Sequence, residues 1–94
     1  MKYEVVFREQ VIDQLVEWEP PQSALDDLER FVDEQLAVNP LGCLQRISGT
    51  GAMQCSCPSI ERPANRVHVF LLRVHYGEDE KTLFVYDAFY YIFG

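Results

Sequence analysis

Three side chains suited to acid–base and phosphate chemistry lie close together in the sequence, at Arg73, His75 and Tyr76. A guanidinium group binds phosphate oxygens, and an imidazole or a phenol can move a proton at a scissile bond. Side chains alternate along a strand, so Arg73 and His75 share one face and Tyr76 takes the other, unless a bulge intervenes. These three residues are the catalytic candidates. The structural alternatives are an ion pair or hydrogen bond at the sheet for Arg73 and a half-buried or solvated position for His75.

Three cysteines, Cys43, Cys55 and Cys57, could on paper join His68 or His75 around a zinc ion. Zinc sites usually contain a Cys-x-x-Cys pair, whereas the Cα atoms of Cys55 and Cys57 in a strand would be about 6.5 Å apart, an awkward spacing for one ion. We therefore predict no metal and no cofactor, with small apolar cysteines lining one strand face. The odd number of cysteines without a secretory signal predicts reduced thiols, no disulfide and a cytoplasmic location. His68 is expected to be structural.

Charge is divided unevenly along the chain. Residues 1–40 contain ten acidic and three basic side chains and so account for the net charge of -7, whereas residues 41–94 contain five of each. The acidic first half repels phosphate backbones, and the second half offers at most a local basic patch. That patch would consist of Arg46, Arg62, Arg66 and Arg73. The pattern argues against broad nucleic-acid affinity and against DNA binding.

Aromatic side chains gather near the end of the sequence, at Tyr86, Phe89, Tyr90 and Tyr91. Such rings can stack on bases, but they can equally fill a core or form a surface that binds a partner. Tyr90 and Tyr91, together with Arg66, are the candidates for substrate binding.

Apolar spacing predicts a strand and then a short helix at the beginning of the chain. Residues 3–7 form a brief apolar run rich in β-forming residues, which predicts a buried strand. From about Glu9 the apolar side chains recur at helical spacing until Pro20-Pro21 stops the pattern. The first helix is therefore expected between these positions.

A second helix is predicted from Ser23 to the residues before Asn39-Pro40. Ser23 followed by Asp26 has the form of a capping box, and the apolar side chains then trace one helical stripe. Several acids lie off this stripe and are expected on a solvated face rather than in a catalytic pair of carboxylates. These acids are Asp26, Asp27, Asp33 and Glu34.

After the second helix the sequence is typical of strands and turns. Residues 44–48 and 52–58 are short candidate strands around the turn Gly49-Thr50-Gly51, and residues 58–65 are expected to form an irregular loop.

Residues 67–76 and 82–93 are dense in β-branched and aromatic side chains, and the acidic stretch at 77–80 predicts a hairpin turn between them. This hairpin should be central to the sheet. Both faces of its strands carry large apolar groups. One face must therefore pack on the helices, and the other must be covered by a partner, by loops or by a functional cleft.

Length and composition predict a single folded domain over residues 1–94, since 48% of the residues are hydrophobic and 13% are aromatic. No apolar run approaches the roughly 20 residues that cross a bilayer, which predicts no membrane segment. The first residues lead directly into a strand rather than a secretory signal, so the mature chain is expected to begin at Met1.

Short stretches of the chain resemble the RelE/ParE superfamily of bacterial toxins. They are Tyr3-Glu4-Val5-Val6-Phe7 before a helix, Asn39-Pro40-Leu41 after the second helix, Arg73-Val74-His75-Tyr76 before an acidic turn and Leu83-Phe84-Val85, and Asp87-Ala88-Phe89, which is similar to the His-Ala-Phe of the HigB-like branch. The resemblance implies an α+β fold in which a helical hairpin packs on one face of a twisted antiparallel sheet. Its element order would be strand, helix, helix and then three or four strands. It also implies ribosome-dependent cleavage of messenger RNA and an antitoxin partner.

The sequence departs from this family after Phe89. In the HigB-like branch a lysine pair follows, whereas Tyr90-Tyr91-Ile92-Phe93-Gly94 follows here. Cleavage on the ribosome needs cations that bind phosphate and stabilise developing charge. The missing lysines and the acidic balance favour a non-catalytic interaction module that binds an antitoxin-like protein or a second copy of itself. The alternatives are an active ribosome-dependent mRNA endoribonuclease and an orphan α+β protein whose likeness to the family is accidental.

Overall fold

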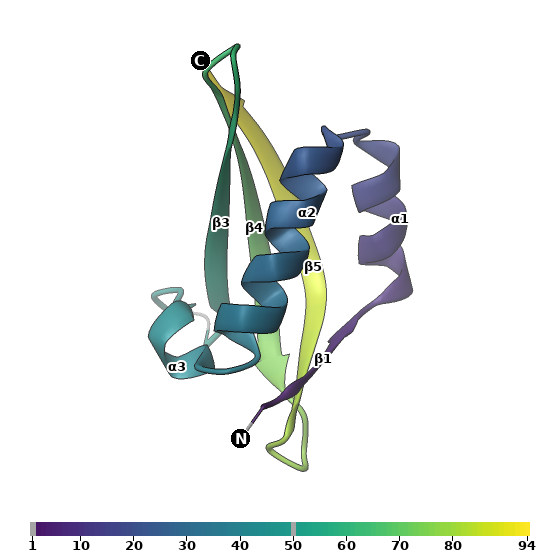
Figure 1. Cartoon of the computed structure of the whole chain (residues 1–94). Coiled ribbons are helices and arrows are strands. Elements are labelled where there is room, and N and C mark those ends of the chain that lie inside the picture. The colour runs from purple at the N-terminus through teal and green to yellow at the C-terminus, as the bar shows by residue number, and fades with distance from the viewer. Residues whose placement is uncertain (1, 50) are drawn as a thin grey trace.

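A helical layer lies on one face of a five-stranded sheet in the computed structural model, which describes residues 2–49 and 51–94 (Figure 1). This arrangement confirms the predicted α+β class. The predicted start at Met1 and the centre of the predicted turn at Thr50 lie outside the described residues. In chain order the elements are β1 (Glu4–Phe7), α1 (Glu9–Glu17), α2 (Gln22–Phe31), a π-helical turn η1 (Val32–Leu36), α3 (Pro40–Cys43), β2 (Gln45–Arg46), β3 (Met53–Glu61), β4 (Arg66–Tyr76) and β5 (Thr82–Phe93).

The strands follow the order β1-β5-β4-β3-β2, which places the β4–β5 hairpin near the centre as predicted. The expectation of an antiparallel sheet is wrong for one pair, because β1 runs parallel to β5, with Glu4 beside Thr82. The α1–α2 hairpin carries the chain from β1 back to the end of the sheet where β1 began (Figure 1). Since β3 and β4 then alternate in direction, β5 runs the same way as β1. At this edge β1 is only half-buried rather than fully buried.

The third strand is longer than predicted, and the expected loop over residues 58–65 is wrong for residues 58–61, whereas residues 62–65 do form the turn between β3 and β4. β3 continues to Glu61, and Pro58 lies opposite Val69 of β4 within the sheet. Beyond its short pairing with β2, β3 has no outer strand neighbour in the described chain. A proline lacks an N–H group but is tolerated at such an edge, which is why Pro58 does not end the strand.

The second helix begins without the predicted capping box. Pro21 occupies the N-cap position, with no side-chain cap among the described residues, and Gln22 donates a hydrogen bond to Asp26 at 2.9 Å. The helix α2 ends at Phe31, and η1 continues it to Leu36. In residues 2–49 and 51–94, no helix has the length and apolar content needed to cross a membrane.

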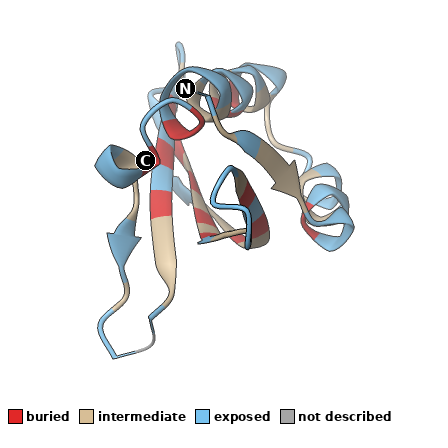
Figure 2. Cartoon of the chain, turned by 90° about the horizontal axis from the view of Figure 1, so that it is seen from below, coloured by how far each residue is buried: buried red, intermediate tan, exposed pale blue. Residues whose placement is uncertain are grey.

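The core lies between the helices and one face of the sheet. Buried and less buried residues alternate along the strands, as Figure 2 shows, and in β4 the buried positions run from His68 to Val74 in steps of two. Buried side chains of the helices pack against them: Val11, Ala24, Leu28 and Leu36.

We call the opposite face of β4 and β5 the open face, because no described helix packs on it. Its side chains are Val67, Val69, Leu71, Arg73 and His75 of β4 and Phe84, Tyr86, Asp87, Phe89, Tyr91 and Phe93 of β5.

Candidate functional site

The three catalytic candidates do not lie on one surface. Arg73 and His75 lie on the open face, whereas Tyr76 lies on the helical side with its ring edge against Tyr3, 5.9 Å between centroids. Burial raises the pKa of Tyr76. A bulge does occur here, but it lies in β5: the register passes from Arg73 opposite Asp87 to Val74 opposite Val85. The expected alternation of the three side chains along β4 is therefore kept.

The His75 ring packs between two aromatic side chains of β5. Its centroid lies 5.4 Å from that of Phe84 and 5.3 Å from that of Tyr86. Nδ1 lies 3.2 Å from the carbonyl oxygen of Tyr76, which can only accept, so Nδ1 donates and a neutral ring keeps Nε2 as an acceptor. The residue lines a shallow hollow that also includes Arg8. Arg8 was not predicted, because only the pairing of β1 with β5 brings it near His75.

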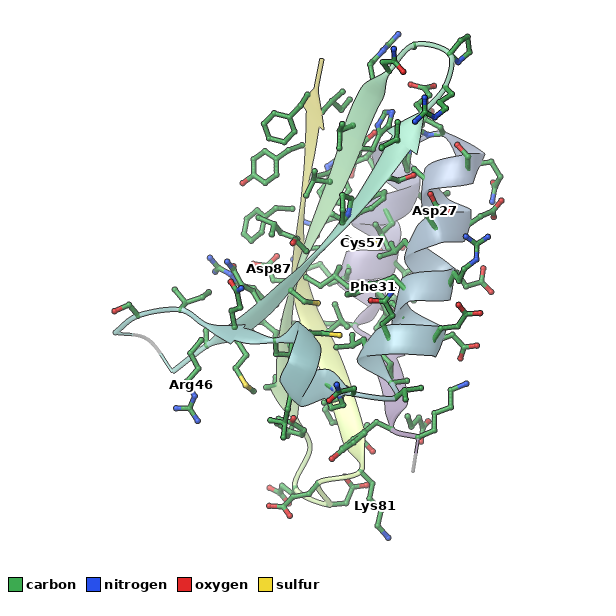
Figure 3. All side chains as sticks on the ribbon, turned by 60° about the vertical axis from the view of Figure 1, so that its left-hand side comes forward. Asp27, Phe31, Arg46, Cys57, Lys81 and Asp87 are labelled. Atoms are coloured by element: carbon green, nitrogen blue, oxygen red, sulfur yellow. The ribbon has the colours of Figure 1, made fainter. Side chains whose placement is uncertain are left out.

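Arg73 has a polar atom without a partner in the middle of the open face. Its guanidinium carbon lies 4.9 Å from the centre of the Phe89 ring, and its buried Nε has no hydrogen-bond partner among the described residues. Asp87 lies directly opposite on β5, on the side of the sheet away from α2 (Figure 3). Asp87 Oδ1 accepts the N–H of Ala88 at 3.0 Å, and in the described part of the chain no ion pair joins Asp87 to Arg73.

The three substrate-binding candidates are also separated. Tyr90 points to the helical side, with its ring 5.1 Å from Phe70 and 5.7 Å from Trp18. Tyr91 lies on the open face and is exposed. Arg66 begins β4 and is exposed, with a long 3.9 Å contact to Glu61. Arg66 lies about 23 Å along the strand from Arg73, seven residues at about 3.3 Å each.

A hydrogen-bonded group involving His68 lies on the helical side of the sheet. His68 is 2% exposed; its Nδ1 lies 2.5 Å from the Tyr90 hydroxyl and its Nε2 lies 3.0 Å from Glu61 Oε1. A carboxylate only accepts, so Nε2 donates to Glu61 and, in the neutral ring, Tyr90 donates to Nδ1. Burial raises the pKa of Tyr90. These contacts agree with the structural role expected for His68.

The cysteines belong to the packed interior. Cys55 and Cys57 face the helices and are buried, and Cys43 is partly buried against the same core. Burial raises the pKa of Cys55 to about 12 and that of Cys57 to about 11. Within residues 2–49 and 51–94, no three histidine, cysteine or acidic side chains are grouped as they would be around a metal ion.

One acid of the second helix departs from the predicted solvated face. Asp27 Oδ2 accepts a hydrogen bond of 2.6 Å from Ser59 of β3, and Asp27 Oδ1 accepts one of 3.2 Å from Arg30. Figure 3 shows Asp27 on α2 facing the strand that carries Cys57. Asp27 lies three residues after the buried Ala24 and therefore on the same side of the helix, which is the sequence signal that sets it apart.

Comparison of the chain with protein-family models, with curated proteins and with solved structures found no match in any of the three. The function must therefore be inferred from the side chains and surfaces of the chain itself.

Proposed function

We propose that this chain is a non-catalytic interaction module of RelE/ParE-like architecture, which binds a protein through its open face. The observation that carries the proposal is the exposure of large rings on that face: Phe84 is 37% exposed, Tyr91 46% and Phe93 58%. Phe84 lies near the start of β5 and Tyr91 and Phe93 near its end, with the partly exposed Tyr86 and Phe89 between them. Exposed apolar side chains along one face mark an interaction site in many proteins. The order strand, helix, helix and strands supports the architecture.

The separation of the candidate residues supports the absence of catalysis. Arg73 and His75 share a face, but Tyr76 and Tyr90 lie on the other side of the sheet, and Arg66 is at the far end of β4. No lysine pair follows Phe89 in the sequence. The loss of one preorganised electrostatic donor typically costs about 2.7–4 kcal/mol of transition-state stabilisation, which would make phosphodiester cleavage very slow.

The partner we propose is an antitoxin-type protein or a second copy of the chain, in the cytoplasm. Unpaired thiols support a reducing compartment, since none of the described cysteines forms a disulfide. The acidic helical layer disfavours an RNA or DNA partner because like charges repel.

The proposal predicts that induced expression in bacteria leaves growth unchanged and that ribosomes loaded with messenger show no cleavage above background. Arg73→Ala and His75→Ala should behave like the unmodified protein in both assays. The matched control is Arg62→Ala, which changes an exposed arginine in the turn between β3 and β4.

The ribonuclease alternative has one specific observation in its favour. In a neutral ring, His75 Nε2 is a proton acceptor on the same face as the phosphate-binding cation Arg73, two residues away along β4. Growth arrest that Arg73→Ala or His75→Ala relieves, and that Arg62→Ala does not, would favour this alternative and refute the non-catalytic proposal.

The binding half of the proposal is tested by co-expression with the protein encoded by the adjacent reading frame. A complex should form with the unmodified chain and be lost in the double variant Tyr91→Ser, Phe93→Ser. Val16→Ser is the matched control, because Val16 is an exposed apolar residue of α1 on the other layer. Binding that survives the double variant would show that the open face is not the interaction surface.

A further inference from the structure

We propose that the open face binds a second copy of this chain, so that two sheets pack face to face with the helices of both copies outside. This inference rests on the proposed function, since it names the partner for the same surface. The two copies would be related by a two-fold axis that lies midway between the two packed sheets. This axis runs parallel to the strands and passes between β4 and β5. Such an axis places β4 of each copy against β5 of the other.

The open face is self-complementary in size under this rotation. Its β4 column is aliphatic over Val67, Val69 and Leu71, and the β5 residues directly opposite them are Phe93, Tyr91 and Phe89. The two-fold axis turns each column of rings onto the aliphatic column of the other copy. Large side chains then face small ones, which is the arrangement that lets two layers interdigitate.

The open face is also self-complementary in charge. Arg73 and Asp87 continue the same two columns, and in the described part of the chain they form no ion pair with each other. The rotation brings Arg73 of each copy opposite Asp87 of the other. Packed sheets lie about 10 Å apart, a gap that an arginine and an aspartate can span together. Because a desolvated pair adds little net affinity, these two pairs would fix the register while the rings supply most of the binding.

The distribution of the remaining charge favours this face over the helical one. The acids that give the chain its net charge of -7 lie mostly in α1, α2 and η1. Packing the open faces together keeps both acidic layers on the outside of the dimer, well beyond the Debye length of about 8 Å. Packing the helices together would press the acids of the two copies against each other.

The open face is long and narrow. Strands β4 and β5, of 11 and 12 residues, run about 36 Å or more, and with β3 of nine residues beside β4 the three strands are about 14 Å wide. The face therefore offers roughly 500 Å² per copy, less than the roughly 800 Å² per partner of a standard interface, so we expect a dimer that forms only as the concentration rises.

The test uses two single variants, Arg73→Asp and Asp87→Arg, in sedimentation equilibrium. The unmodified chain should dimerise with increasing concentration. Each variant alone should self-associate roughly tenfold or more weakly, because like charges then face each other at both symmetric positions. An equimolar mixture of the two variants should regain dimers, because each aspartate of one copy then meets an arginine of the other. An ion pair between positions 73 and 87 of the same chain could not restore dimers when the two variants are mixed.

A second measurement needs no variant and covers the case in which one of them fails to fold. Hydroxyl-radical labelling of Tyr91 and Phe93 should fall as the concentration of the unmodified protein rises, while labelling of Leu41, exposed on α3, should not change.

Two outcomes overturn the inference. One is a monomer over the whole concentration range; if the adjacent-frame protein then protects Tyr91 and Phe93, the proposed function stands and only the second copy is excluded. The other is a dimer whose two charge variants associate no better mixed than alone. Growth arrest relieved by Arg73→Ala, in contrast, would refute the proposed function itself.

Discussion

At the scale of single residues, His68 has a hydrogen-bonding partner at each ring nitrogen while almost fully buried. We expect His68→Ala to lower the free energy of unfolding by about 2–3 kcal/mol, because it opens a cavity and leaves Glu61 and the Tyr90 hydroxyl unpaired. Tyr90→Phe, which removes one hydrogen bond, should cost about 1 kcal/mol. Urea denaturation measures both values.

The matched control is His75→Ala, because His75 is exposed and, among the residues that the structure describes, its ring bonds only to the adjacent carbonyl. If the two histidine variants lost equal stability, the contacts of His68 would not have the role assigned to them.

The buried thiols predict a loss of stability in alkali. Burial in the folded state raises the pKa of Cys55 to about 12 and that of Cys57 to about 11, from the ordinary thiol value of 9.0. Between pH 9 and these raised pKa values, the thiols of the unfolded chain have lost protons that the folded chain keeps. The free energy of unfolding therefore falls as pH rises above about 9. The slope from both thiols together is at most about 2.7 kcal/mol per pH unit.

Denaturation of the double variant Cys55→Ala, Cys57→Ala over the same pH range isolates this contribution. Its stability should fall less steeply, although some slope remains because burial also raises the pKa of Tyr76 and Tyr90. Identical slopes for the two proteins would exclude the thiols as the cause.

Alternation along a strand is local, so the sequence alone places Arg73 and His75 on one face and Tyr76 on the other. The same alternation puts the neighbours Tyr90 and Tyr91 on opposite faces, but it could not tell which of the two faces the helices. The bulge at Tyr86 adds one residue to β5 and so reverses which residues face the helices. Odd-numbered residues face them before the bulge, and even-numbered residues do so after it: Leu83 and Val85, then Ala88 and Tyr90. No local pattern marks this change. The grouping of both tyrosines in one binding site therefore went against the local alternation, and the face that each tyrosine takes depends on the bulge.

At the scale of elements, Asp27 joins α2 to β3 through its hydrogen bond from Ser59, a residue that is itself buried. We expect Asp27→Ala to cost about 1–2 kcal/mol, because the Ser59 hydroxyl would stay buried without its acceptor. Urea denaturation checks this value. Glu29→Ala is the matched control, since Glu29 is an exposed acid of the same helix. A smaller loss for Asp27→Ala than for Glu29→Ala would contradict the proposed tie between helix and strand.

The predicted elements were most accurate where the signal is local. Helix α1 and the β4–β5 hairpin follow from apolar periodicity and turn residues within their own segments. β3 can continue through Pro58 because, in the described chain, it has a strand neighbour on only one side at that residue. The parallel direction of β1 depends on β5, its partner at the other end of the chain. Local residue spacing indicates neither of these relations.

At the scale of the whole molecule, the acidic helical layer is a source of self-repulsion. Screening by salt should therefore stabilise the fold, and we expect the thermal midpoint to rise by a few degrees as NaCl is added to a low-salt buffer. The double variant Glu17→Gln, Glu29→Gln lowers the magnitude of the net charge of -7 by two and should show a smaller rise. Circular dichroism melts measure both. An equal rise in the two proteins would point to a general effect of salt on apolar burial instead.

The pairing of β1 with β5 has a consequence for how the chain emerges during translation. Residues 4–7 are made first and residues 82–85, their partners in the sheet, are made near the end. At about 5–20 residues per second, the β1 segment and the apolar stripes of α1 and α2 would wait roughly 4–15 s for the strand that completes their layer. A nascent chain in this state exposes aggregation-prone apolar surface for most of its synthesis. The yield of folded protein should therefore depend on chaperone supply and improve when the growth temperature is lowered.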